Sequence, residues 1–67
     1  ASLEVDCPPE LLAVLPEDKR AALLAVLAQD PRPQYQDDPR RVYGMAFAGL
    51  EVKFRVAGER LTVTEIS

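Results

Sequence analysis

Three charged side chains alternate with apolar ones in the second half of the chain. The stretch LEVKFRV, residues 50–56, places Glu51, Lys53 and Arg55 at every second position. Because successive side chains of a β-strand point to opposite faces, these charges would share one face of a strand. The planar guanidinium of Arg55 could bind two phosphate oxygens at once, whereas Lys53 would act as a point charge. The alternative is a solvated sheet face on which the three charges form salt bridges.

The composition excludes several other kinds of chemistry. The chain of 67 residues contains no histidine and a single cysteine, Cys7. The usual zinc ligand sets, the Ser-His-Asp and Cys-His arrangements and an intrachain disulfide therefore cannot form. We expect no metal and no cofactor, and we expect Cys7 to be a small buried side chain.

The charge is unevenly distributed along the chain. The net charge is −3, yet most basic residues follow residue 31: Arg32, Arg40, Arg41, Lys53, Arg55 and Arg60. An acidic chain with mixed signs on its sheet face should bind single-stranded RNA only weakly. No apolar run approaches the roughly 18 residues that cross a bilayer, and no signal peptide precedes Glu4. We therefore expect one soluble cytoplasmic domain, residues 1–67, with no membrane partner.

The first half of the chain predicts a strand and two helices. Residues 2–7 alternate between apolar and polar side chains, which is typical of a strand. Residues 9–15 and 16–30 have helical spacing of leucines, and the second segment is rich in alanine and leucine. Lys19 and Arg20 are expected on its solvated face. Residues 30–40 form a proline-rich loop, in which Tyr35 is the expected anchor.

The second half predicts an antiparallel ribbon of three strands. Two-residue turns at 48–49 and 58–59 would place Tyr43 opposite Phe54 and Leu61 opposite Val56, and this register puts the large apolar residues on one face. The alternation breaks at Glu65-Ile66, where we expect a bulge or the end of the sheet. The predicted core comprises Leu3, Val5, Leu12, Leu23, Leu27, Phe47, Val52, Phe54 and Val63. The outer face would carry Glu51, Lys53 and Arg55, with Gly44 and Ala46 leaving room beside them.

The sequence has LAVLP before the second helix, LAQDP at its end and GLEVKFRV after the turn. With these motifs, the order of the elements resembles the RelE/ParE superfamily of bacterial type II toxins. The resemblance implies an α+β fold with an N-terminal strand, a two-helix hairpin and a three-stranded antiparallel meander. It also implies either a ribosome-dependent mRNA endonuclease or a gyrase-directed or catalytically degenerate relative. An antitoxin protein would then be the partner, and the ribosome with its mRNA, or DNA gyrase, would be the target.

The resemblance assigns roles to individual residues. Glu51 would be the base or a repulsive lid over the site, with Lys53 and Arg55 completing a catalytic group that stabilises charge on a phosphate, and Arg40 and Arg41 would bind RNA. The catalytic tail that follows the last strand in such toxins has no counterpart before Ser67. Whether the chain is an enzyme, and whether it forms a homodimer, stays open. The alternative hypothesis is a non-enzymatic protein-protein interaction module whose sheet edge or groove binds a partner.

Overall fold

The computed structural model describes residues 3–32 and 38–67, which form six elements. A short strand, β1 (Glu4–Asp6), is followed by the helices α1 (Pro9–Leu12) and α2 (Glu17–Ala28). The strands β2 (Tyr43–Phe47), β3 (Leu50–Ala57) and β4 (Arg60–Ile66) complete the chain. The predicted anchor Tyr35 lies outside the described residues. In the described part of the chain, no helix is long and apolar enough to cross a bilayer.

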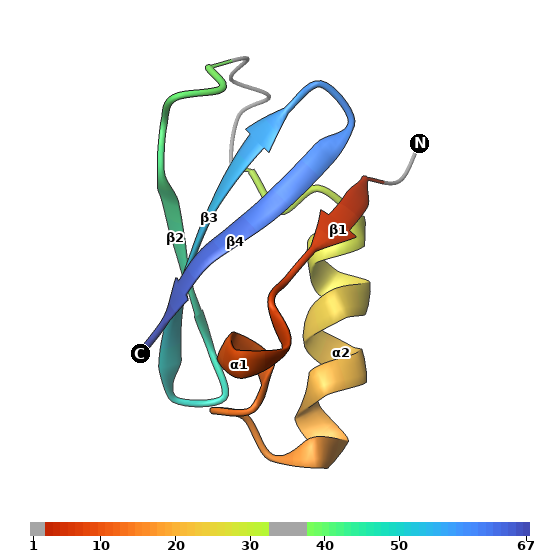
Figure 1. Ribbon diagram of the computed structural model, residues 1–67, viewed down its shortest axis with the longest axis vertical. Helices are drawn as coiled ribbons and strands as arrows, with labels where there is room; N and C mark the ends of the chain where they lie inside the picture. The colour runs from red at the N-terminus through yellow and green to blue at the C-terminus, as the bar shows by residue number, and fades with distance from the viewer. Residues whose placement is uncertain (1–2, 33–37) are drawn as a thin grey trace.

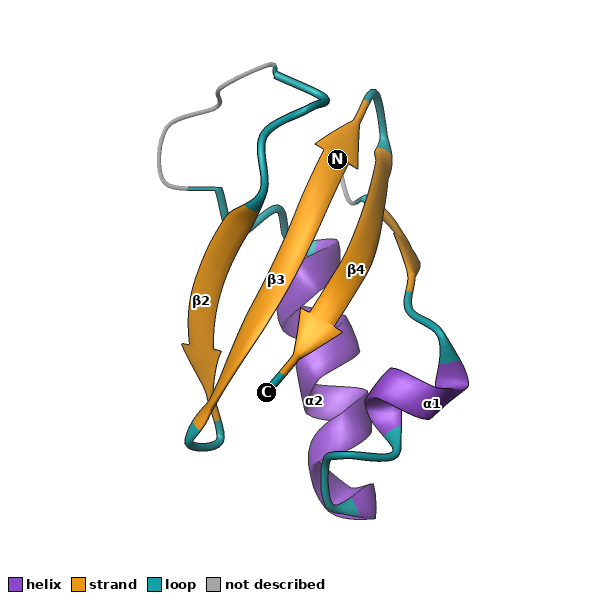
Figure 2. Ribbon diagram, turned by 60° about the vertical axis from the view of Figure 1, so that its left-hand side comes forward, coloured by secondary structure: helices purple, strands orange, loops and turns teal. Residues whose placement is uncertain are grey.

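The four strands form one mixed sheet in the order β1-β4-β3-β2. β2, β3 and β4 are antiparallel neighbours, whereas β1 pairs in parallel with β4 and sets Val5 opposite Leu61. The predicted fold class was therefore wrong: the sheet is not a three-stranded antiparallel meander. There is no two-helix hairpin either, because α1 has only four residues, about one turn. Both helices lie on the same side of the sheet, as Figures 1 and 2 show.

The hydrophobic core lies between the sheet and α2. Of the predicted core, Leu23, Leu27, Val52, Phe54 and Val63 are buried, and the other four residues are half-buried and pack against them. Leu15, Tyr43, Val56, Leu61 and Ile66 are also buried. Inside this core the ring of Tyr43 stacks on that of Phe54, with centroids 5.5 Å apart. The alternation of apolar residues in the strands therefore predicted correctly which residues face the core. The spacing of leucines predicted the residues of α2 that pack against them.

The predicted register of the ribbon is confirmed. Tyr43 lies opposite Phe54, and Val56 lies opposite Leu61. Ala48 and Gly49 both have positive φ values, 52° and 80°, the combination that a type I′ turn requires. A bulge interrupts β4 as expected, because Phe54 pairs with Val63 while Lys53 pairs with Glu65, which leaves Thr64 as the extra residue. The bulge returns Ile66 to the core face and puts Glu65 on the outer face.

Arg20 connects the two helices, so its predicted place on a solvated face was wrong. Its Nε donates hydrogen bonds to the carbonyls of Leu12, at 3.0 Å, and Leu15, at 3.1 Å. Leu12 is the last residue of α1, and its carbonyl also accepts a hydrogen bond from the backbone N–H of Leu15 at 3.0 Å. Leu15 lies in the short connection between the two helices. The half-buried guanidinium thus fixes the end of α1 against the start of α2. Helical spacing alone cannot report this contact, because it depends on where the preceding helix ends.

Asp30 ends α2 in a left-handed conformation, with φ of 61°. Its backbone N–H donates to the carbonyl of Leu27 at 3.2 Å, as in the caps that close many helices. Its carboxylate accepts two hydrogen bonds from the guanidinium of Arg32, at 2.7 and 2.6 Å. Each side chain of this ion pair is only 11% exposed. The pair therefore fixes the direction in which the chain leaves the helix.

Candidate nucleic-acid interface

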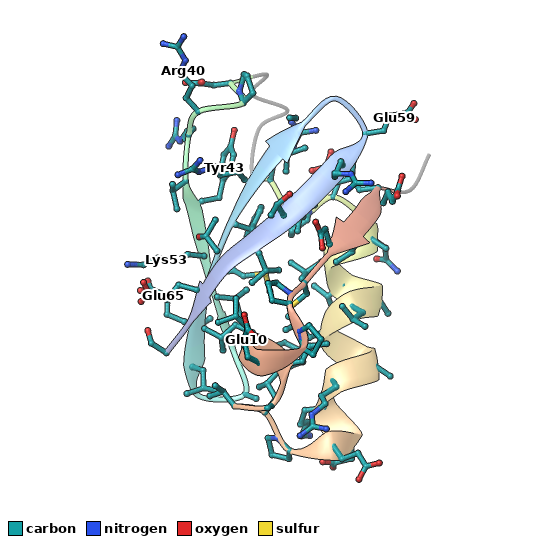
Figure 3. The ribbon with its side chains drawn as sticks, in the orientation of Figure 1. Glu10, Arg40, Tyr43, Lys53, Glu59 and Glu65 are labelled. Carbon is teal, nitrogen blue, oxygen red and sulfur yellow. The ribbon has the colours of Figure 1, made fainter. Side chains whose placement is uncertain are left out.

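The outer face of the sheet brings the predicted charges together. Glu51, Lys53 and Arg55 lie at alternating positions of β3, between buried neighbours, and pair across to Ala46, Gly44 and Thr62. Figure 3 shows Lys53 and Glu65 projecting on the side of the sheet away from the helices. The placement of these three residues on one face therefore follows the predicted alternation. Glu65 was missed as a member of this face, because the bulge that turns it outward could be located only approximately.

The middle of this face is occupied by ion pairs. Nζ of Lys53 lies 4.0 Å from a carboxylate oxygen of Glu51 and 4.0 Å from one of Glu65. All three side chains are largely exposed, so each pair contributes at most about 1 kcal/mol. The Glu51 carboxylate also lies over Gly44, where a Cβ added to the glycine would sit 3.4 Å from Oε2. The space expected beside Gly44 is thus partly filled, and the charge of Lys53 is balanced by two carboxylates.

The end of the sheet beyond Lys53 is basic. Arg55 lies two positions further along β3, and its neighbour Phe54 pairs with Tyr43, the first residue of β2. Arg40 and Arg41 immediately precede that strand, so the chain brings all three arginines to the same end of the sheet. Figure 3 shows Arg40 projecting beyond the end of β2. We call Arg40, Arg41 and Arg55 the arginine patch.

A tight turn presents two of these arginines. The sequence Asp38-Pro39-Arg40-Arg41 has Asp and Pro at the first two positions, which favours a type I β-turn. The backbone N–H of Arg41 donates to the carbonyl of Asp38 at 3.1 Å, and that of Arg40 donates to the Asp38 carboxylate at 3.0 Å. The guanidinium of Arg41 lies over the ring of Tyr43, 5.3 Å from its centroid. The turn and the ring therefore hold this segment in place.

Two arginines of the patch form no ion pair in the described part of the chain. Among the described residues, no carboxylate lies within ion-pair distance of the guanidinium of Arg40 or Arg55. Of the acids that the structure describes, Asp38 is the nearest to Arg40 in sequence, and its carboxylate accepts a hydrogen bond from the backbone N–H of Arg40. By contrast, Arg60 at the β1 side of the sheet is paired with Glu4, at 3.0 Å, and Asp6, at 3.5 Å. Planar guanidinium groups without a carboxylate partner are suited to bind phosphate oxygens in two contacts at once.

Cys7 is half-buried, close to its predicted environment. Burial raises the pKa of its thiol, and the negative charge of Asp6 raises that pKa further. A thiol of this kind stays protonated near neutral pH and is a poor nucleophile. Within residues 3–32 and 38–67, no group of three or more Cys, Asp or Glu side chains is arranged to hold a metal ion.

Comparison with known proteins identifies relatives of this chain. The family model of the TrmO C-terminal domain matches residues 1–67. A curated protein of Eikenella corrodens, tRNA (adenine(37)-N6)-methyltransferase, is 49% identical over 55 residues, which cover 81% of this chain. The match covers 31% of that relative, so the chain spans about a third of its length. No solved structure matches the chain.

These findings overturn the resemblance to RelE/ParE toxins. The toxin function, including mRNA cleavage and gyrase poisoning, was wrong, and so were the antitoxin, ribosome and gyrase as partners. The alternative of a non-enzymatic protein-protein interaction module is not supported either. The catalytic roles of Glu51, Lys53 and Arg55 came from that resemblance, and neither the structure nor the comparisons test them. Because the family model matches the whole chain, the chain belongs to the family of TrmO C-terminal domains.

Proposed function

We propose that this chain is a tRNA-binding domain of a tRNA (adenine(37)-N6)-methyltransferase, and that its arginine patch contacts the tRNA. The observation that carries the proposal is the 49% identity to a protein of that name. Since the chain covers 31% of that relative, methyl transfer is attributed to the whole protein. The contribution that we assign to these residues is binding of the substrate.

The distribution of charge supports this assignment. A tRNA is a polyanion, and proteins gain much of their affinity for nucleic acids from arginine and lysine contacts to phosphates. Arg40 and Arg55 have no carboxylate partner among the described residues; Arg40 projects beyond the end of β2, and Arg55 lies on the outer face of β3. Lys53 has a different role in this proposal, because two carboxylates already balance its charge. It holds the middle of the sheet face in place.

Two further parts of the proposal concern the extent and the location of the protein. The chain acts as a single domain, in keeping with one family model over residues 1–67 and one hydrophobic core in the described part. It acts in the cytoplasm, where a methyltransferase meets its tRNA. Both points follow from the family and from the proposed substrate.

The proposal predicts that the patch contributes to the KM for tRNA. In the gene product that carries this chain, we expect the combined change Arg40→Ala, Arg41→Ala and Arg55→Ala to raise KM about tenfold, which corresponds to about 1.4 kcal/mol. The kcat should stay the same, because the lost contacts bind the ground state and the transition state equally. Methyl transfer to tRNA, measured at a range of tRNA concentrations near physiological salt, gives both constants.

The matched control is Arg60→Ala. Arg60 is another exposed arginine of the sheet, but Glu4 and Asp6 already pair with it. We expect its replacement to change KM less than about twofold, since it adds no unbalanced charge. An unchanged KM in the triple variant, or an equal change in both variants, would contradict the proposed function.

A further inference from the structure

Resting on the proposed function, the geometry points to a more specific ligand for the arginine patch. We propose that it binds the phosphate backbone of a double-helical segment of tRNA rather than unpaired bases. Proteins recognise RNA duplexes by shape, through contacts to phosphates and 2′-hydroxyl groups. They recognise unpaired bases by stacking them on exposed aromatic rings or arginine planes and by hydrogen bonds to the base edges. The two modes therefore need different side chains on the binding face.

The outer face lacks an aromatic platform within the described part of the chain. Tyr43 is 6% exposed and Phe54 is 1% exposed, and their rings stack on each other inside the core. Phe47 is half-buried and packs against the same core. The outward positions of the neighbouring strand β2 are Gly44 and Ala46, which offer no surface on which a base could stack.

The groups that remain on this face suit a sugar-phosphate backbone. Arg55 supplies guanidinium donors on this face and Arg40 projects beyond the end of β2, whereas the guanidinium of Arg41 lies over the inward-facing ring of Tyr43 at the same end of the sheet. Thr62 lies directly opposite Arg55 on β4 and adds a hydroxyl beside it. The hydroxyl of Thr64, in contrast, donates to the carbonyl of Lys53 at 3.2 Å. The guanidinium of Arg55 could bind a phosphate while the neighbouring hydroxyl of Thr62 forms a hydrogen bond with a ribose 2′-hydroxyl.

The neighbouring charges limit the size of the contact. Glu51 and Glu65 flank Lys53 and leave this group with a net negative charge, directly beside Arg55. A polyanion should therefore bind at the end of the sheet and be repelled from its middle. The contact would cover few phosphates, about one for each arginine of the patch. Such a contact contributes a modest affinity that depends only moderately on salt.

Binding of two defined RNA probes tests this inference. The gene product that carries the chain is titrated with a fully paired RNA hairpin and with an unpaired oligouridine of equal length. In the variant that lacks all three arginines, we expect hairpin affinity to fall about tenfold and oligouridine affinity to change less than about twofold. The slope of log affinity against log salt for the hairpin should decrease by about 2 to 3, since each phosphate contact contributes about 0.9.

Two controls make the outcomes distinct. Arg60→Ala should leave both affinities unchanged, and unchanged far-UV circular dichroism of each variant excludes misfolding. An equal loss for both probes, or a larger loss for oligouridine, would overturn the duplex preference while leaving tRNA binding by the patch intact. A loss for neither probe, together with an unchanged KM for tRNA, would overturn the proposed function itself. A selective loss of oligouridine affinity in Tyr35→Ala would show that base stacking contributes and would also overturn the inference.

Discussion

Phe54→Ala is expected to destabilise the domain by about 3 to 5 kcal/mol. Phe54 is 1% exposed, lies on the central strand β3 and stacks on Tyr43 at a centroid distance of 5.5 Å. Removal of its ring leaves a cavity in the core and also breaks the aromatic pair with Tyr43. A domain of this size has a total free energy of unfolding of about 3 to 10 kcal/mol. The variant should therefore be largely unfolded, as measured by urea denaturation monitored by circular dichroism.

Phe54→Leu serves as the matched control. It keeps an apolar side chain of similar volume, so we expect a loss of less than about 1.5 kcal/mol from changed packing. If Phe54→Ala unfolds at the same urea concentration as the unaltered chain, the packing of β3 between β2 and β4 described above is incorrect.

Asp30→Ala is expected to have the second largest effect, about 2 to 3 kcal/mol at neutral pH. The substitution removes a carboxylate that accepts two hydrogen bonds from Arg32 in a site where both side chains are 11% exposed. Hydrogen bonds to charged groups contribute about 1.5 to 3 kcal/mol. Alanine also tolerates the φ of 61° less well than aspartate does. Thermal or urea unfolding at pH 7 measures the loss.

Asp30→Asn separates the two causes and makes the effect depend on pH. Asparagine adopts the left-handed conformation readily, so this variant keeps the backbone geometry and loses the charge together with one of the two oxygens that accept from Arg32. Hydrogen bonds from the side chain of Arg32 lower the pKa of Asp30 below its ordinary value of 3.8. The stability that its ionised form provides is therefore present above about pH 4 and is lost as the pH falls through the lowered pKa. A stability difference from Asp30→Asn that is as large at pH 2 as at pH 7 would contradict this account.

The antiparallel ribbon β2-β3-β4 could be predicted from the sequence because residues close together in the chain determine its turns and its register. Alternation from Leu50 to Val56 and the glycines at 49 and 58 determine which residues face the core, and a slip of one residue would bury charges. The pairing of β1 with β4 depends on residues nearly sixty positions apart, Glu4 and Arg60. A three-residue strand contains too little information to select that partner. The parallel edge of the sheet was therefore missed.

The order of elements was a poor guide to the family. A strand, helices and an antiparallel ribbon occur in unrelated proteins, so a likeness at this level does not determine function. The arginine patch was visible in the sequence as separate residues, Arg40, Arg41 and Arg55. What the sequence could not show is the balance of charge around them. That balance depends on the bulge that moves Glu65 next to Lys53 and on the turn that starts at Asp38.

Site-specific photo-crosslinking shows whether the end of the sheet that carries the arginine patch contacts tRNA. Two exposed valines form a matched pair: Val42, 46% exposed, is next to the patch, and Val26, 38% exposed, is on α2. A photoreactive phenylalanine analogue replaces each of them in turn in the gene product that carries this chain, and the complex with tRNA is irradiated. We expect a crosslink to tRNA from position 42 and none from position 26. A crosslink from position 26 alone, or none from position 42 in a complex that binds tRNA, would contradict this expectation.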